Sequence, residues 1–198
     1  LQLPLPLALL QHYALWGEVL ASGHAHGDNI FPALEGGLVL IQSVDPVKTL
    51  QLPMPTFHLV LVCPEITIET RKARALLQQP WMLGDIVRQS ADLASVIAGL
   101  YSGDDNLLRD HLNDSLIAPR RSALIPGFDA VCQAARDNGA MACSLSGSGP
   151  TMFALVASSD QAEGVRSAMI QAFANQSLNC QSWVSPVSSQ GAVLVEES

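Results

Sequence analysis

Apolar residues recur at two different spacings along the chain, one typical of helices and the other typical of buried strands. Over residues 6–21 they return every three or four positions, and Pro6 suits the first helical turn, so the pattern predicts a helix. The same spacing predicts helices over residues 30–34, 83–101, 106–117, 126–138 and 159–175, and one that follows a loop within residues 66–77.

Short apolar runs bounded by turn residues predict the strands. They cover residues 37–44, 57–63, 140–145, 152–157, 179–186 and 191–195. Because strands and helices alternate irregularly, we expect an α+β fold in which helices pack on an antiparallel sheet. Three prolines within residues 45–56 mark the expected domain boundary.

A polar stretch, SGHAHGDNIFPALEGG, separates the first predicted helix from the first predicted strand. Its glycines permit tight turns. Asp28 or Asn29 can cap the short helix 30–34, whose positive N-terminal end suits an anion. The stretch is therefore either a polar nest that holds a ligand or a loop that only caps a helix.

A second polar motif, SGSGPT at residues 146–151, lies between two predicted strands. Gly147 and Gly149 let the backbone pass close to a ligand, and consecutive exposed N–H groups bind anionic oxygens. The motif lacks the Lys and the following helix of a Walker loop. A tight hairpin between the two strands is the alternative.

The charge balance limits the classes of partner. A net charge of −8 and an isoelectric point near 4.9 argue against nucleic acid or an anionic membrane, since both need a basic face. No apolar run reaches the length of a membrane span. Half of the Lys and Arg residues fall in two clusters, which either bind a small anion or form solvated faces: Arg71, Lys72 and Arg74, then Arg120 and Arg121. Thr70 and Arg74 lie four positions apart, so on a helix they share a face and can reach one ligand.

The cysteines indicate the compartment. Cys63, Cys132, Cys143 and Cys180 lie far apart, without CxxC spacing, which is typical of buried thiols in a reducing compartment. We therefore expect a cytoplasmic location. The apolar opening LQLPLPLALL lacks the basic region and cleavage site of a signal peptide, and we interpret it as the middle of a longer protein.

Five short motifs occur in an order that is far more specific than any one of them. They are HGDN at 26–29, TRKAR at 70–74, APRR at 118–121, LIPGF at 124–128 and SLSGSGPT at 144–151. Over nearly the whole chain, this order resembles the homoserine kinases, a branch of the GHMP small-molecule kinases.

The resemblance implies a GHMP C-terminal domain over residues 57–198, a ferredoxin-like α/β sandwich with helices on an antiparallel sheet. It also implies a linker over 46–56 and, over 1–45, a remnant of the ribosomal-protein-S5-like domain that binds ATP. In the family that domain carries a phosphate loop of the form PxxxGLGSSA, and no such string occurs here. We therefore expect the sequence to be the C-terminal portion of an enzyme, inactive alone, with an exposed apolar helix at 6–21.

The resemblance also assigns the site residues. Glu18 matches an acid that helps to hold Mg²⁺ on the nucleotide phosphates, and Asn29 matches a residue near the acceptor hydroxyl, so these two are the expected catalytic residues. The expected substrate contacts are His26, Asn29, Thr70, Arg74 and Arg121, and the two guanidinium groups suit a carboxylate. The expected ATP-side loop is Ser146, Gly147, Ser148, Gly149 and Thr151.

Some residues depart from the family pattern or have no counterpart in it. The family often has Glu where this chain has Ala118, so the support of Arg121 is expected to differ. His24 has no assigned counterpart, and Asp28 either caps the helix or acts as a general base.

The implied reaction transfers the γ-phosphoryl group of ATP to the hydroxyl of L-homoserine, giving O-phospho-L-homoserine for threonine biosynthesis. The implied cofactors are ATP and Mg²⁺, and we expect a homodimer. Two alternatives stay open: a GHMP kinase that acts on another alcohol, such as mevalonate, and a non-catalytic module that binds an amino acid.

Overall fold

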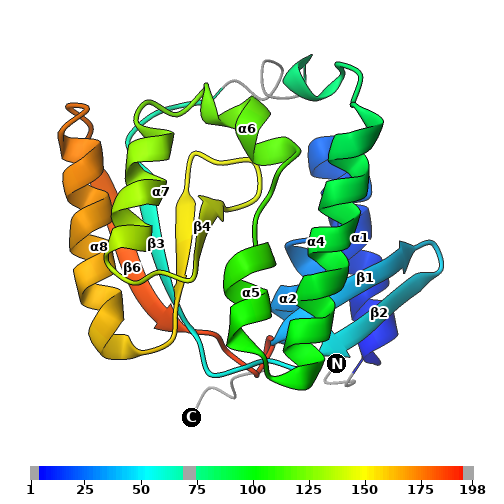
Figure 1. The fold of residues 1–198 in the computed structure, drawn as a ribbon. Helices are drawn as coiled ribbons and strands as arrows, with labels where there is room; N and C mark the ends of the chain where they lie inside the picture. Colours follow the sequence, from blue (N-terminus) through cyan, green and yellow to red (C-terminus); the bar gives the residue numbers. More distant parts are fainter. Residues whose placement is uncertain (1–4, 69–74, 194–198) are drawn as a thin grey trace, which may run out of the picture. The chain divides into compact units, whose positions relative to one another are not determined.

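The computed structural model describes residues 5–68 and 75–193. These residues form two compact units, each described by itself below (Figure 1). Unit 1 contains the described residues up to Met54 together with residues 188–193, and unit 2 contains the described residues from Pro55 to Val187. Among the described residues, no helix combines the length and the apolar character needed to cross a bilayer.

Unit 1 begins with two helices. α1 (Leu7–Ser22) ends where Gly23 adopts a left-handed conformation with φ of 79° and donates its N–H to the Val19 carbonyl. Glycine commonly ends helices in this way, because without a Cβ it adopts the left-handed conformation without a steric clash. α2 (Ile30–Glu35) follows the polar stretch, and its Phe31 side chain is fully buried.

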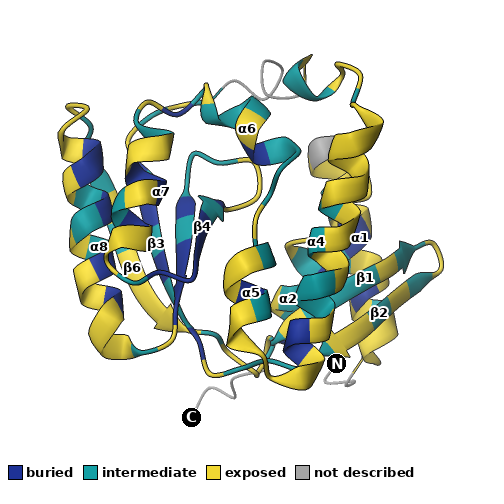
Figure 2. Cartoon of the chain, in the orientation of Figure 1, coloured by how far each residue is buried: buried dark blue, intermediate teal, exposed yellow. Residues whose placement is uncertain are grey.

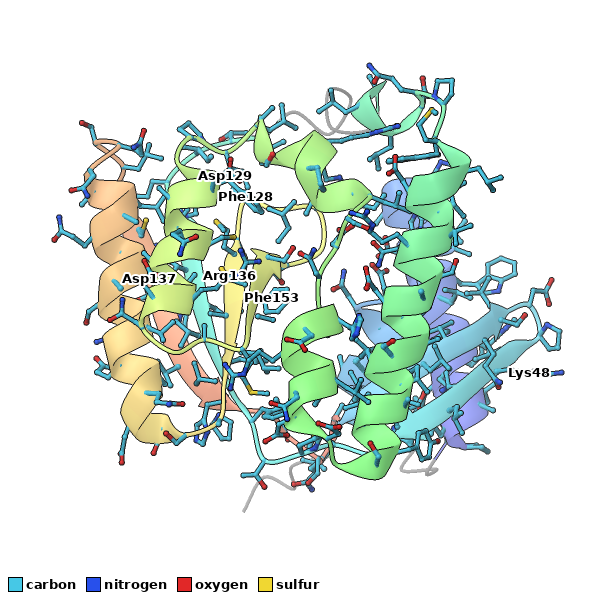
Figure 3. The ribbon with its side chains drawn as sticks, viewed as in Figure 1. Lys48, Phe128, Asp129, Arg136, Asp137 and Phe153 are labelled. Carbon is cyan, nitrogen blue, oxygen red and sulfur yellow. The ribbon has the colours of Figure 1, made fainter. Side chains whose placement is uncertain are left out.

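The helices of unit 1 are followed by an antiparallel hairpin, β1 (Leu38–Val44) and β2 (Val47–Leu52). The prediction of a linker over residues 46–56 is wrong for the six residues of β2. Half-buried and exposed residues largely alternate along β2, as a strand with one covered face requires. The prolines that suggested a linker flank this strand, and Lys48 extends from the exposed end of the hairpin (Figure 3).

The described C-terminal residues return to unit 1 beside α2. Gly37 donates its N–H to the Ser188 carbonyl at 2.7 Å, and Ala192 donates to the Ala33 carbonyl at 2.9 Å. A Cβ at Gly191 would overlap the Leu34 carbonyl, so only glycine fits this crossing. Residues 191–193 are therefore held to α2 in an irregular conformation, and the predicted strand is wrong for them.

Unit 2 is built on an antiparallel sheet with the strand order β4-β5-β3-β6. The strands are β3 (His58–Pro64), β4 (Ala142–Leu145), β5 (Met152–Val156) and β6 (Cys180–Pro186). α7 (Phe128–Asp137) and α8 (Ser159–Ala174) cover one face, and the buried side chains lie between these helices and the sheet (Figure 2). The predicted α+β fold with helices on an antiparallel sheet is confirmed.

α7 shows how the sequence sets one of these helices. Val131, Cys132 and Ala135 are buried, and Ala135 follows the other two by four and three positions, so they form the stripe that meets the sheet. Asp129 lies in the first turn and Arg136 in the last, as the helix dipole favours. Figure 3 shows both at the two ends of α7.

Unit 2 also contains α4 (Leu83–Ser102), α5 (Asp105–His111) and α6 (Ile117–Ser122). The prediction of one helix over residues 106–117 is wrong, because α5 ends at His111 and α6 starts only at Ile117. Pro119 does not break a helix. It lies in the first turn of α6, where its missing N–H leaves no helical hydrogen bond unmade.

Candidate functional site

The SGSGPT motif forms the turn between β4 and β5. Leu145 pairs with Met152 at the end of the ladder, and Ser146 donates its N–H to the Thr151 carbonyl at 2.8 Å. Gly147 and Gly149 have φ of 60° and 74°, which favour glycine. The turn is the tight hairpin that the sequence left as an alternative, and it also exposes Ser146, Gly147 and Ser148 to solvent. A hairpin of this kind presents backbone groups to a ligand while its base stays fixed by the sheet.

Arg121 reaches this turn from α6. Its Nη1 donates to the Gly147 carbonyl at 3.1 Å, so one predicted substrate residue touches the predicted ATP-side loop. Its Nε is buried and finds no hydrogen-bond acceptor among the described residues. A buried cationic donor without an acceptor is costly, so the Arg121 guanidinium is a place where an anionic oxygen would bind favourably.

Asp114 fixes the start of α6. Its Oδ1 accepts the N–H groups of Leu116 and Ile117 at 3.0 and 2.7 Å, and its Oδ2 accepts that of Ala118 at 2.9 Å. One carboxylate thus satisfies three of the N–H groups that a helix start leaves without partners. Ala118, the residue for which the resemblance implied a different support of Arg121, is buried.

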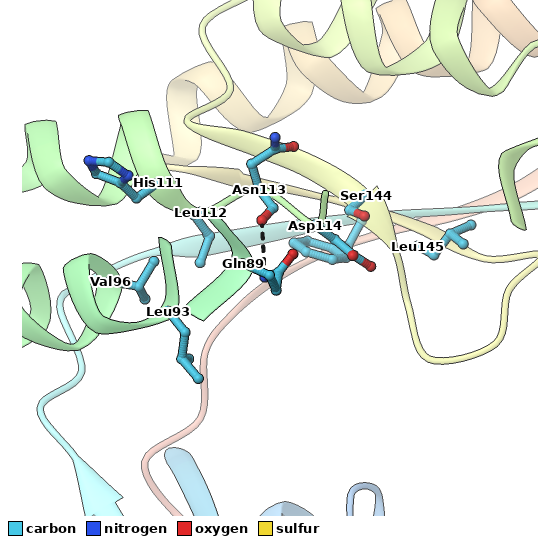
Figure 4. A pocket seen from close by; sticks show the side chains of 10 residues that line it. Gln89, Leu93, Val96, His111, Leu112, Asn113, Asp114, Ser144 and Leu145 are labelled. Carbon is cyan, nitrogen blue, oxygen red and sulfur yellow. Dashed lines mark hydrogen bonds between the residues drawn. The ribbon is translucent and has the colours of Figure 1, made fainter. Parts of the chain in front are cut away.

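A pocket of about 240 Å³ lies beside this helix start (Figure 4). Gln89 of α4 lines it and ties down the loop before α6: its Oε1 accepts the Ser115 N–H at 2.8 Å and the Ser115 hydroxyl at 3.1 Å. On another wall, His111 Nδ1 lies 2.9 Å from the Asp92 carboxylate. The polar groups of the pocket thus hold α4, α5 and α6 together.

Arg120, next to Arg121, has a different environment. Its guanidinium donates to the carbonyl oxygens of residues 76, 79 and 80, and it stacks 3.1 Å from the ring centroid of Trp81. The basic pair predicted from the sequence is therefore divided between two tasks. Arg120 binds three backbone carbonyl groups, whereas Arg121 binds one and has a buried Nε without an acceptor among the described residues.

Unit 1 carries the remaining described candidates. Glu18 is half-buried on α1, and His26 and Asn29 are exposed in the turn before α2. Asn29 is the N-cap residue of α2, but within the described residues neither it nor Asp28 caps the helix with its side chain, so the predicted cap is wrong. Gly27 is needed for space, because a Cβ there would overlap the buried ring of Phe31.

The structure brings together only part of the predicted site. Arg121 and the loop of Ser146, Gly147, Ser148, Gly149 and Thr151 belong to unit 2, whereas Glu18, His26 and Asn29 belong to unit 1. Thr70 and Arg74 lie outside the described residues. The sequence reasoning missed Asp114 and Arg120, although an acid shortly before a helical segment is a recognised capping signal.

The described residues do not form a complete metal site by themselves, since no group of three or more His, Cys, Asp or Glu side chains converges among them. Mg²⁺ commonly takes one or two protein carboxylates and completes its coordination with water and substrate phosphates. A single carboxylate such as Glu18 fits a Mg²⁺ ion that arrives with a nucleotide, and does not fit an ion held by protein alone.

Comparison with known proteins gives one family match and a set of similar chains. Residues 96–175 match the family described as GHMP kinases C terminal. The chain contains a GHMP kinase C-terminal domain. This domain holds the contact between Arg121 and the SGSGPT turn, and the Asp114 cap.

Two homoserine kinases are similar to this chain beyond the matched residues as well. Homoserine kinase of Xylella fastidiosa strain M12 is 46% identical over 97% of this chain and 59% of its own length. Homoserine kinase of Chlorobaculum tepidum is 41% identical over 94% of this chain and 58% of its own length. The chain thus spans about three fifths of the length of these relatives.

Solved structures agree with the GHMP fold. The crystal structure of homoserine kinase from Cytophaga hutchinsonii superposes with a TM-score of 0.91 at 38% identity, over 95% of this chain and 60% of that chain. Mevalonate kinase of L. major, crystallised with R-mevalonate, gives a TM-score of 0.71 at 21% identity over 96% of this chain and 61% of its own. The second likeness concerns the fold alone.

Proposed function

We propose that the protein to which this chain belongs is a homoserine kinase, which transfers the γ-phosphoryl group of ATP to the hydroxyl of L-homoserine. The observation that carries the proposal is the Arg121 guanidinium, held against the Gly147 carbonyl with its buried Nε unpaired. The 46% identity to a homoserine kinase over nearly the whole chain supports the choice of substrate.

In this proposal charged side chains bind the amino acid, and backbone N–H groups bind the nucleotide. Arg121 and Arg74 bind the carboxylate of homoserine, because a planar guanidinium presents two parallel donors to two carboxylate oxygens. His26 and Thr70 complete the substrate contacts, and Asn29 orients the acceptor hydroxyl. The exposed N–H groups of the SGSGPT turn face the phosphates.

The chain's own contribution to catalysis is alignment. Phosphoryl transfer passes through a loose transition state, so holding the acceptor oxygen in line with the phosphorus supplies much of the acceleration. Glu18 would help to hold a Mg²⁺ ion that arrives with ATP, and that ion would supply neutralisation of the phosphate charge. We assign no general base, and Asp28 is an exposed carboxylate in the same turn as Asn29.

The wider assignments follow from the same proposal. The product, O-phospho-L-homoserine, would serve threonine biosynthesis in the cytoplasm, and the enzyme would be a homodimer. Residues 1–45 would belong to the ATP-binding domain and residues 57–198 to the C-terminal domain. The 198 residues alone would turn over no ATP, and homoserine-dependent ADP formation by this chain would contradict that statement.

The test uses the full-length parent enzyme. Arg121→Ala and Arg74→Ala should each weaken homoserine binding by about 2 to 4 kcal/mol, as expected when one partner of a buried charged contact is removed. The KM for ATP should stay within about twofold, since neither residue is assigned to the nucleotide. Arg136→Ala, an exposed arginine at the end of α7, is the matched control and should leave both KM values unchanged.

Two results would overturn the proposal. Activity of the parent on mevalonate or galactose but not on homoserine would indicate another GHMP kinase. Amino-acid binding without any ADP formation, under conditions where ATP binds, would indicate a non-catalytic module. A loss that fell on ATP instead of homoserine would refute the assignment of Arg121 and Arg74.

A further inference from the structure

Several donors of the Arg120 guanidinium are used by this chain's own backbone, so Arg120 is not suited to bind substrate directly. Nη1 donates to the Leu76 and Gln79 carbonyl oxygens at 3.3 and 2.8 Å, and Nη2 donates to the Pro80 carbonyl at 2.7 Å. The guanidinium plane also lies 3.1 Å from the centroid of the Trp81 ring. Its charge is thus compensated by carbonyl dipoles and an aromatic face, and none of the described carboxylates pairs with it.

One of the carbonyl groups that Arg120 binds, that of Leu76, lies in the last turn of a helical segment, and the other two lie in the chain just after it. Residues 75–77 are helical, and Gln78 donates its N–H to the Ala75 carbonyl at 3.2 Å as the helix ends. The last carbonyl groups of a helix have no partner within it, so a cationic side chain that binds them ends the helix favourably. Arg120 therefore acts as a C-terminal cap supplied by a residue more than forty positions away.

The position of Arg120 gives this cap a functional meaning. Its neighbour Arg121 contacts the SGSGPT turn, and residue 75 follows Arg74 directly in the chain. The short helix α6 is itself fixed at its start by Asp114 and, through Ser115, by Gln89 of α4. Two adjacent side chains of α6 thus connect the segment after Arg74 with the turn that Arg121 touches.

We propose that Arg120 is a positioning residue for homoserine, which holds residues 75–81 against α6 so that the segment after Arg74 and the Arg121 guanidinium keep a fixed separation. This inference rests on the proposed function, because Arg74 and Arg121 are the proposed carboxylate ligands. Arg120 itself does not touch the substrate. Only an arginine can do this, since the three carbonyl groups and the Trp81 ring require a planar fork with several donors.

The kinetic test compares two variants of the full-length parent. Arg120→Lys keeps the charge but loses the fork, and should raise the KM for homoserine about tenfold with kcat and the KM for ATP within about twofold. Trp81→Leu removes the stacking face and should raise the same KM about threefold, whereas Trp81→Phe, which keeps an aromatic face, should restore most of it. Arg136→Lys on the exposed end of α7 is the control and should change nothing.

A second measurement does not depend on activity. Hydrogen exchange of a peptide covering residues 75–82 should be at least fivefold faster in Arg120→Lys than in wild type, with peptides of α7 and α8 unchanged. The inference is overturned if this exchange is unchanged, or if Arg120→Lys lowers thermal stability while the homoserine KM stays at the wild-type value. A parent enzyme that does not phosphorylate homoserine would refute the proposed function, and the exchange result would still decide whether Arg120 holds the segment.

Discussion

Glu35 is the side chain that joins the elements of unit 1. Its Oε1 accepts from Gln11 of α1 at 2.7 Å, and its Oε2 accepts from Thr49 and Gln51 of β2, each at 3.2 Å. Gln11 is buried, with 6% of its surface exposed. Glu35→Ala would leave these donors without their acceptor, so we expect the free energy of unfolding to fall by about 2 to 4 kcal/mol. Urea unfolding followed by Trp16 fluorescence, with the other tryptophans replaced by Phe, measures this loss.

The matched control for Glu35 is Glu163 on α8, an exposed acid that pairs with Arg166 three residues later. Glu163→Ala should cost less than about 1 kcal/mol, because solvent screens surface ion pairs. Glu35→Gln keeps one acceptor oxygen and should fall between wild type and Glu35→Ala. Equal losses for Glu35→Ala and Glu163→Ala would show that Glu35 does not hold unit 1 together.

Cys180 permits a prediction about pH. Burial, followed by the neighbouring Cys63 and Glu65, raises the pKa of the Cys180 thiol to about 11 from an ordinary value of 9.0. The neutral thiol is therefore favoured in the folded chain, and the reactive thiolate forms only as the pH rises through about 11. At pH 8 the fraction of Cys180 in the thiolate form is about a hundredfold lower in the folded than in the unfolded chain. Each folded-state thiolate is about tenfold more nucleophilic, because nucleophilicity rises with pKa.

We therefore expect iodoacetamide to modify folded Cys180 about tenfold more slowly at pH 8 than the same residue in urea-unfolded chain. The rate should keep rising up to pH 10.5. Peptide-level mass spectrometry distinguishes this thiol from the other cysteines. A folded-state rate that levels off near pH 9 would refute the assigned pKa.

Among the elements, α6 carries Arg121, a substrate ligand in the proposed function. Asp114→Ala removes the acceptor of three N–H groups at the helix start, so we expect a stability loss of about 1 to 3 kcal/mol. It should also raise the homoserine KM of the parent, since α6 no longer holds Arg121 in place. Steady-state kinetics and thermal unfolding of the same preparation measure both effects.

The N-cap of α5 provides the comparison for Asp114. Asp104 accepts the N–H groups of Asn106 and Leu107 at 2.9 and 3.4 Å, but α5 carries none of the proposed site residues. Asp104→Ala should cost about 1 kcal/mol of stability and leave the homoserine KM unchanged. If the two variants alter the homoserine KM equally, the effect of Asp114 is general destabilisation and the role given to α6 is wrong.

Most elements of the fold could be predicted from the sequence because their patterns are local. The buried stripe of α7 and the apolar runs of β3 and β5 repeat at the period of the structure they form. β2 was missed because the prolines near it suggested a loop. These prolines lie outside the strand, so they remove no hydrogen-bond donor from it. The break between α5 and α6 was missed because Leu108, Leu112 and Leu116 keep a helical spacing across it.

The candidate site could be predicted only in part. Arg121 and the SGSGPT turn could be identified from motif order, and their contact confirms that this part of the chain comes together. The role of Arg120 could not be foreseen, because it depends on carbonyl groups more than forty residues away that no local pattern reveals. For the same reason the spacing of apolar residues does not predict that Glu35 binds both α1 and β2.

Across the whole molecule, the two units are covalently linked twice, because the chain passes from unit 1 to unit 2 after Met54 and returns after Val187. The return depends on Gly191, since a side chain there would overlap the Leu34 carbonyl. Sequence patterns cannot reveal such a crossing, because the two segments lie far apart in the chain. Unit 1 is thus closed by residues from both ends of the described sequence.

The apolar surface of α1 leads to a prediction about association. Large apolar side chains are exposed along the helix, including Trp16 at 62% and Leu20 at 85% of their surface, although Gln11 and Leu15 are buried. Contiguous apolar surface of this kind promotes association in water. We therefore expect the weight-average mass of the 198-residue chain in sedimentation equilibrium to rise with concentration. Trp16→Gln with Leu20→Gln should suppress the rise and keep the helix, because Gln is a good helix former.

The control pair for α1 lies at the start of α4, where Met82 and Leu83 are 74% and 75% exposed. Replacing both by Gln removes a similar apolar area from unit 2, so a general effect of surface hydrophobicity would reduce association equally in the two double variants. We expect only the α1 pair to do so, because its exposed residues continue along the helix from Leu7 to Leu20. A wild-type mass that is independent of concentration would show that the exposed face of α1 does not drive association.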